Sequence, residues 1–130
     1  KNAEMGIKAI EAVSPKLTDD AFALQLSRQE LKFSEIRDKA RHEMLEGRAE
    51  EYRSSGVTDL MLKGGIQANT LLNTSTSHIA ELMIQGSNRG LTSMWKALNH
   101  YGNAGNESTE LARELMDFEE KTIEKLKKYL

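Results

Sequence analysis

Apolar side chains recur every three or four positions along most of the chain, which is the period of an amphipathic α-helix. Strict alternation of apolar and polar residues, the signal of a half-buried strand, is almost absent, and there is one proline. The pattern predicts an all-α protein with four helices at about 1–13, 19–54, 66–101 and 107–130. Proline and glycine signals that end helices occur between them, in "SPKLTDD", "RSSG", the glycine pair at 64–65 and "GNAGN".

The second and fourth predicted helices carry long apolar stripes. On segment 19–54, positions spaced alternately by four and three residues are Phe22, Leu26, Gln29, Phe33, Ile36, Ala40 and Met44. On segment 107–130 one stripe consists of Leu111, Leu115, Phe118, Thr122 and Tyr129. Spacing by four and three is typical of helices that pack lengthwise in a bundle. Gln29 is therefore predicted to be a polar residue at an interior position.

The lengths of the connections predict how the helices are arranged. The connections after the first and third helices are short, so each of these helices should lie antiparallel to the next one. We expect an up-down-up-down four-helix bundle in which segments 19–54 and 66–101 form a long central hairpin. The whole chain, 1–130, is expected to form a single helical bundle domain.

The first helix is much shorter than the second and third. At about 1.5 Å per residue, segments 19–54 and 66–101 would each be ~54 Å long, and segment 1–13 only ~20 Å. Part of the central hairpin therefore lacks a cover, and a groove of that kind is normally filled by a partner chain or by further residues of the same chain. Because Lys1 already lies within a helical pattern, we expect the first helix to be incomplete, and we expect a homodimer.

Composition and charge narrow the classes of partner. Eighteen basic and twenty acidic residues give a net charge of −2, which provides no electrostatic footprint for nucleic acid. No apolar run approaches the ~18–20 residues of a membrane span, and no signal-peptide pattern is present. The absence of cysteine is compatible with a reducing compartment. We expect a soluble cytoplasmic protein that acts without a membrane or nucleic acid partner.

The stretch "NTSTSHIAELMIQG" places a polar run before the most apolar part of the third helix. If the helix is continuous, polar side chains lie near the middle of the bundle, with Gln29 facing them from the second helix. These ligand candidates are Asn73, Ser77, His78, Glu81, Gln85 and Asn88. If Ser75 or Ser77 caps a new helix instead, the chain kinks here. We favour continuity because "NTLLNTSTSHIAELM" contains neither glycine nor proline.

Metal chemistry in a helical bundle needs carboxylate and imidazole ligands that project inward together. The nearest arrangement here is His78-x-x-Glu81, with Gln29 from the second helix and Glu119 from the fourth. These residues could form a degenerate mononuclear site for iron, manganese or zinc. In the interpretation we favour, Gln29 and His78 are buried and hydrogen-bonded, Glu81 and Glu119 are solvated or paired, and no cofactor binds.

Two further patterns bear on function. No nucleophile elbow, Ser-x-x-Lys site or phosphate-binding loop is present, so the sequence predicts no catalytic residue. Gly86 and Gly90 lie four residues apart on one helix stripe, although each glycine costs about 1 kcal/mol in a helix interior. We expect close helix packing there, and close approach of a ligand is the alternative.

The helix lengths, short connections and polar mid-bundle resemble ferritin-like four-helix bundles, and specifically small bacterial members of unknown function. The resemblance covers most of the chain but no specific motif, because none of His42, His78 and His100 belongs to a Glu-x-x-His pair. It implies metal storage or oxidation chemistry, but no ligand can be carried over by position. We therefore expect a non-catalytic bundle that acts through oligomerisation or an unidentified protein partner. The alternative is a ferritin-like protein that binds a metal or small ligand.

Overall fold

The structure is a computed structural model that describes residues 1–47, 62, 65–66, 73–100 and 106–130. These residues contain helices and no strand, which confirms the all-α prediction for this part of the chain. The elements are α1 (Asn2–Val13), the short 3-10 helix η1 (Ser14–Lys16), α2 (Asp20–Gly47), α4 (Thr76–His100) and α5 (Asn106–Lys127). Parts of the predicted helices, at 48–54, 67–72 and 101, lie outside the described residues.

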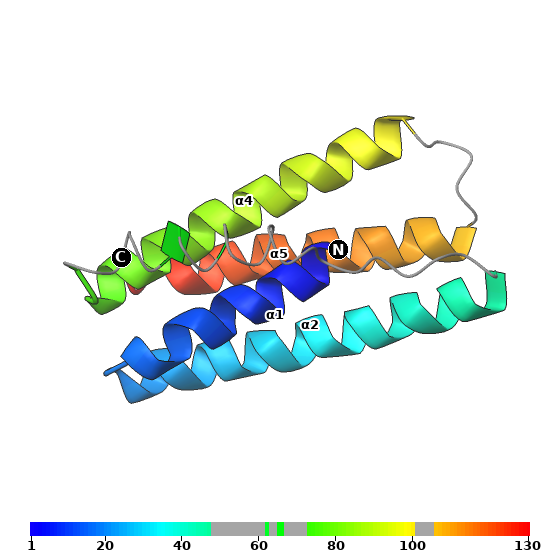
Figure 1. The fold of residues 1–130 in the computed structure, drawn as a ribbon. Helices are drawn as coiled ribbons and strands as arrows, with labels where there is room; N and C mark the ends of the chain where they lie inside the picture. The colour runs from blue at the N-terminus through cyan, green and yellow to red at the C-terminus, as the bar shows by residue number, and fades with distance from the viewer. Residues whose placement is uncertain (48–61, 63–64, 67–72, 101–105) are drawn as a thin grey trace.

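The helices form two antiparallel hairpins that pack against each other (Figure 1). One hairpin consists of α1 and α2, and the other consists of α4 and α5. Across the junction α2 packs on α5 and α1 packs on α4. The core therefore lies between four helices arranged at the corners of a square, and each hairpin contributes two neighbouring corners.

The expected central hairpin is not observed. Figure 1 shows α2 and α4 running in the same direction, and they occupy opposite corners of the square. The prediction of an up-down-up-down order was wrong because it took these two helices as antiparallel neighbours, although short connections set the direction only within each hairpin. The end of α2 and the start of α4 lie at opposite ends of the bundle.

Hydrogen bonds from side chains to backbone set where α2 and α4 begin. At α2, Asp19 Oδ1 accepts a bond of 2.8 Å from the Phe22 N–H, so Asp19 is the capping residue. At α4, Ser75 Oγ accepts a bond of 3.2 Å from the His78 N–H. Asn73 Oδ1 accepts a bond of 3.0 Å from the Ser75 N–H.

The caps decide between the two interpretations of the polar run. Residues 73–75 are not helical, and α4 begins at Thr76. The prediction of a continuous helix from 66 to 101 was therefore wrong, and the capping alternative is the observed one. Asn and Ser side chains offer the backbone local hydrogen-bond partners that compete with helix continuation, so a helix can start without glycine or proline before it.

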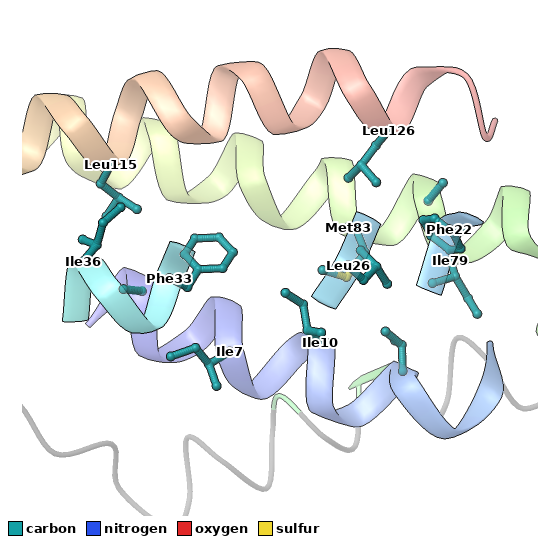
Figure 2. Close-up of a cluster of buried hydrophobic side chains, with 13 residues drawn as sticks. Ile7, Ile10, Phe22, Leu26, Phe33, Ile36, Ile79, Met83, Leu115 and Leu126 are labelled. Atoms are coloured by element: carbon teal, nitrogen blue, oxygen red, sulfur yellow. The ribbon is translucent and has the colours of Figure 1, made fainter. Parts of the chain in front are cut away.

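The buried side chains follow the predicted seam for only part of its length. Phe22, Leu26, Gln29, Phe33 and Ile36 of α2 are buried, as the spacing predicts. Figure 2 shows the apolar members packed among residues of the other helices; the labelled ones are Ile7, Ile10, Ile79, Met83, Leu115 and Leu126. Ala40 and Met44, which continue the seam, are only partly buried. The core thus stops about two thirds of the way along α2.

Two aromatic contacts fix the alignment of α2 against α5. Phe22 lies against Tyr129 with ring centroids 4.8 Å apart. Phe33 meets Phe118 edge-on at 5.1 Å and an interplanar angle of 86°, a geometry that aromatic pairs prefer. In the antiparallel register set by these two pairs, Gln29 comes opposite Thr122.

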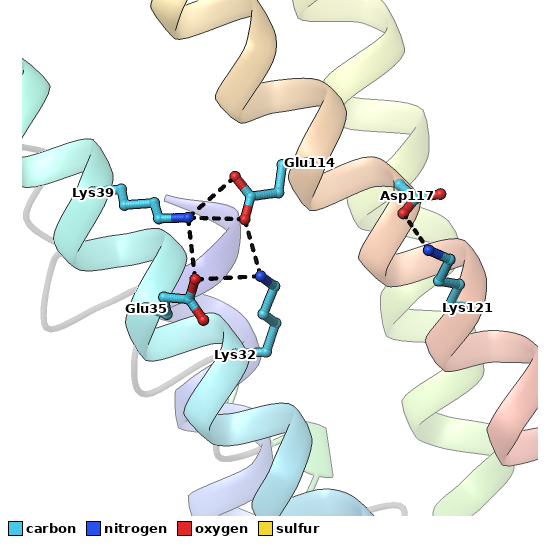
Figure 3. A network of polar contacts seen from close by, with 6 residues as sticks. All are labelled: Lys32, Glu35, Lys39, Glu114, Asp117 and Lys121. Carbon is cyan, nitrogen blue, oxygen red and sulfur yellow. Dashed lines mark hydrogen bonds and ion pairs between the residues drawn. The ribbon is translucent and has the colours of Figure 1, made fainter.

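Ion pairs on the outer surface join the same two helices (Figure 3). Glu114 of α5 accepts hydrogen bonds from Lys32 at 2.9 Å and Lys39 at 3.1 Å, both on α2. These bonds lower the pKa of Glu114 and raise the pKa values of both lysines. Exposed pairs contribute little stability, so the network orients the helices more than it stabilises them.

Among the described helices, none has a stretch that is both long and apolar enough to cross a membrane.

Candidate functional site

A pocket of about 480 Å³ lies where the two hairpins meet. Its volume falls in the ~300–1,000 Å³ range of small-molecule sites in proteins. The apolar part of its wall includes Met5, Ala9, Val13, Phe33, Leu82 and Met83. Gln29 of α2, Ser87 of α4 and Glu119 of α5 supply buried polar groups. Apolar walls with a few polar groups from several helices are typical of ligand sites in helical bundles.

Glu119 is the buried acid of this pocket. Only 4% of the residue is exposed, and its carboxyl group lies directly against the backbone of Gly90 in α4. A Cβ atom at position 90 would come within 2.6 Å of Oε2 and 2.9 Å of Oε1, which is closer than such atoms can approach. Glycine at position 90 therefore makes room for the carboxyl group.

Burial changes the protonation of Glu119. Loss of solvation raises its pKa to about 8, because the charged form is disfavoured away from water. The other charged side chains that line the pocket are Lys1 and Arg89, and both residues are exposed. At neutral pH Glu119 is therefore mainly a neutral carboxylic acid, which can donate a hydrogen bond as well as accept one.

Gln29 is the second polar group in the wall, and it is 1% exposed. Neither Nε2 nor Oε1 of Gln29 has a hydrogen-bond partner in the described part of the protein, and Glu119 Oε2 also lacks one. Thr122 Oγ1 likewise has no hydrogen-bond partner among the described residues. Leaving a buried polar group unsatisfied costs about 1–3 kcal/mol, so four such atoms in adjacent turns require an explanation.

A second glycine, Gly6, shapes the part of the pocket wall that α1 contributes. A Cβ atom at Gly6 of α1 would lie 2.7–2.9 Å from three ring carbons of Phe33, so the ring packs on bare backbone. The Asn2 side chain donates a hydrogen bond of 3.2 Å to the Gly90 carbonyl and ties the start of α1 to α4. At Gly86 no atom lies within 4 Å of where a Cβ would be, although this residue also lines the pocket.

The structure brings together two of the predicted site residues and separates the others. Gln29 and Glu119 both line the pocket and are buried, although Glu119 was expected to be solvated or paired. Gln85 also lines the pocket but is exposed. Asn73, Ser77 and Asn88 are exposed; Asn73 precedes α4, and the other two lie on the solvent-facing side of that helix.

The proposed metal ligands do not converge. His78 Nδ1 lies 3.8 Å from Glu81 Oε2, but the Glu81 side chain is 57% exposed. Glu119 lies against Gly90, twelve residues or ~18 Å further along α4 than His78. Among the residues that the structure describes, no group of three His, Cys, Asp or Glu side chains could hold a metal ion. The predicted set of His78, Glu81, Glu119 and Gln29 is therefore not assembled.

The surroundings of Gly86 and Gly90 on α4 can be compared with the close helix packing expected at both positions. Gly90 does have a close neighbour, but the neighbour is a carboxyl group and not the backbone of another helix. Gly86 faces open space. Of the two positions, only Gly90 thus lies against a described residue of α5.

Two buried polar residues were not identified as site residues from the sequence. Thr122 lies on the apolar stripe of α5 and is 2% exposed, and Ser87 of α4 is 7% exposed. The position of Thr122 at the spacing of core residues was the available signal. Its relation to Gln29 depends on the register of α2 and α5, which single-helix periodicity does not give.

Comparisons of the chain with protein-family models, curated proteins and solved structures find no match.

Proposed function

We propose that this chain binds a small organic molecule in the pocket between its two hairpins. The observation that carries the proposal is the position of Gln29 and Glu119, which are almost fully buried and line one pocket. Three of their side-chain atoms have no hydrogen-bond partner among the described residues. A ligand that hydrogen-bonds to these atoms would offset the free energy lost when they are buried. The apolar walls would hold the rest of such a molecule.

The donor set favours an organic ligand over a metal ion. One carboxyl group and one amide are fewer and weaker ligands than iron, manganese or zinc sites normally have. A metal at Glu119 stays the alternative proposal, with Gln29 as its neighbour. The same reasoning supports a binding protein more than an enzyme, because no nucleophile–base pair is found among the described residues that line the pocket.

The resemblance to ferritin-like bundles is part of the proposal. Ferritin-like proteins have one long crossover connection between antiparallel helix pairs. Parallel α2 and α4 at opposite corners are consistent with that connectivity. This supports a related layout, but iron chemistry does not follow from layout.

A pocket-filling variant tests the binding function. Gly86→Leu places a large side chain in open space at the pocket wall, so we expect it to fold and to occupy the site. Asn88→Leu adds the same side chain to an exposed position of α4 outside this pocket and is the matched control. Fragments that perturb NMR signals of pocket residues should bind the native chain and Asn88→Leu, and bind Gly86→Leu at least tenfold more weakly, a loss of about 1.4 kcal/mol.

The result can also go the other way. If no member of a chemically diverse fragment library perturbs residues around Gln29 and Glu119, the proposed function is wrong. Stoichiometric metal in protein purified without chelator, lost in Glu119→Gln, would replace it with the metal alternative.

A homodimer is the second proposal, and one observation favours it. The core ends at Ile36 of α2, Ser87 of α4 and Leu115 of α5, and no described residue beyond these positions is fully buried. Apolar residues in that half stay partly exposed; they are Ala40, Met44, Leu91, Met94, Leu98, Leu111 and Ala112. A second copy of the chain could cover them.

A further inference from the structure

Resting on the proposed function, we propose that the ligand is an uncharged molecule with a hydrogen-bond donor next to an acceptor, such as a primary amide, lactam or urea. The geometry of Gln29 and Glu119 points to this class. Both side chains can present a donor and an acceptor side by side, and a ligand group of the same kind pairs with them without bringing a charge into the interior.

Gln29 is the first part of the argument. Its amide offers one oxygen acceptor and one nitrogen donor, and neither has a partner in the part of the chain that the structure describes, while the residue is 1% exposed. A ligand carbonyl can accept from Nε2 while the adjacent ligand N–H donates to Oε1. A single planar group of this kind satisfies both atoms, whereas a group with donors only or acceptors only leaves one of them unpaired.

Glu119 is the second part. Its Oε2 is also unpartnered, and the carboxyl group is held against Gly90 at the pocket wall. The neutral acid can donate its proton to the second lone pair of a ligand carbonyl. An amide ligand therefore uses the three unpartnered atoms of Gln29 and Glu119 and leaves no charge buried without a partner.

Charged ligands fit the wall less well. An ammonium group could pair with ionised Glu119 and Gln29 Oε1, but it has no acceptor for Gln29 Nε2. A carboxylate would place a negative charge beside the Glu119 carboxyl and would have no donor for Gln29 Oε1. The charged side chains at the pocket, Lys1 and Arg89, are exposed, and the residues of α2 at the pocket, Gln29 and Phe33, carry no charge.

Three probes with one scaffold separate these classes: phenylpropanamide, phenylpropylamine and phenylpropanoate. Their dissociation constants for the native chain are measured at pH 6.5 by NMR titration. We expect the amide to bind at least tenfold more tightly than either charged probe, which corresponds to about 1.4 kcal/mol. An amine that binds as tightly as the amide, with release of a proton measured by calorimetry in two buffers, overturns the proposal.

Variants of the two polar residues refine the test. Gln29→Leu replaces the amide with an apolar side chain of similar size and removes two unsatisfied atoms, so we expect it to fold. It should lose the preference for the amide over an alcohol with the same scaffold. Glu119→Gln keeps a neutral donor and acceptor, so it should retain amide binding; loss of amide binding in this variant alone would contradict the assigned role of Glu119.

The pH dependence supplies a readout that a purely structural role would not change. If only the protonated acid binds, raising the pH to 9 reduces the competent fraction and weakens amide binding about tenfold. Glu119→Gln should bind equally at both pH values. If library fragments bind at the pocket but none of the three probes does, the ligand class is wrong while the binding function stands; if the library also fails, both proposals fall.

Discussion

At the scale of single residues, Glu119 shows how a neighbouring glycine can change the protonation of a buried carboxyl group. The acid is buried because Gly90 leaves room for it, and burial shifts its pKa to about 8. An alanine at position 90 would push the carboxyl group out of its place. The unusual protonation is therefore a property of the pair and not of Glu119 alone.

This pKa predicts a specific dependence of stability on pH. The folded chain holds a proton on Glu119 that the unfolded chain releases near its ordinary value of 4.5. The contribution is therefore fully present below about pH 4.5 and is lost as the pH rises through about 8. Glu119→Gln should be more stable than the native chain at pH 9 by roughly 3–6 kcal/mol, and close to it at pH 4.5. Urea denaturation of both proteins at the two pH values measures the difference, and an equal difference at both would contradict the shifted pKa.

Residue identity and periodicity predicted part of this site. Gln29 could be placed in the interior because it occupies a seam position between Leu26 and Phe33. Glu119 could only be placed beside the core, since the glycine that accommodates it lies on another helix. A pocket shared by four helices depends on how they are arranged, and helix periodicity does not contain that information.

At the scale of helices, Gly6 and Gly86 form a pair for comparison, because a Cβ atom would be crowded at Gly6 and would have space at Gly86. Gly6→Ala should destabilise the protein by about 1–3 kcal/mol, because the new methyl group meets the buried Phe33 ring, which Phe118 holds from another side. Gly86→Ala should stabilise it by about 0.5–1 kcal/mol, because the helix gains propensity and the methyl group meets nothing. Thermal unfolding of both variants gives the comparison. Effects of the same sign would contradict the packing described for α1.

Helix boundaries were predictable where the signal is local. The proline at position 15 ends the first helix close to the predicted place. The start of α4 was missed by ten residues, because a cap at Ser75 or Ser77 was weighed against an unbroken helix-forming sequence, and Ser75 does cap the helix. Local hydrogen bonds of a few polar side chains thus outweighed propensity.

At the scale of the whole molecule, α1 is shorter than α2, α4 and α5, so in the described part of the chain only these three helices extend past its start. If a second copy covers the three helices there, sedimentation equilibrium should give about twice the 14.6 kDa of one chain. Leu98→Glu introduces a charge among the partly exposed apolar residues of α4 and should produce monomers. Leu31→Glu, at a position that is already 71% exposed on the outer side of α2, is the control and should leave the mass unchanged. A native mass of one chain would exclude the dimer.

The order of the helices was the least predictable feature. Periodicity identifies the face that each helix buries but not the direction in which its neighbour runs. The short connections predicted the direction within each hairpin, but no local signal gave the direction of α4 relative to α2.

The division into two hairpins has a consequence for folding. Each hairpin is formed by neighbouring helices, whereas Gln29 and Glu119 come from different hairpins and meet only when the two halves dock. A molecule bound between them has affinity for the docked state alone. It would therefore raise the free energy of unfolding with the logarithm of its concentration and slow the separation of the halves. Resistance to unfolding would then report how much ligand is present, so chain lifetime in the presence of a protease would rise when ligand is abundant and fall when it is scarce.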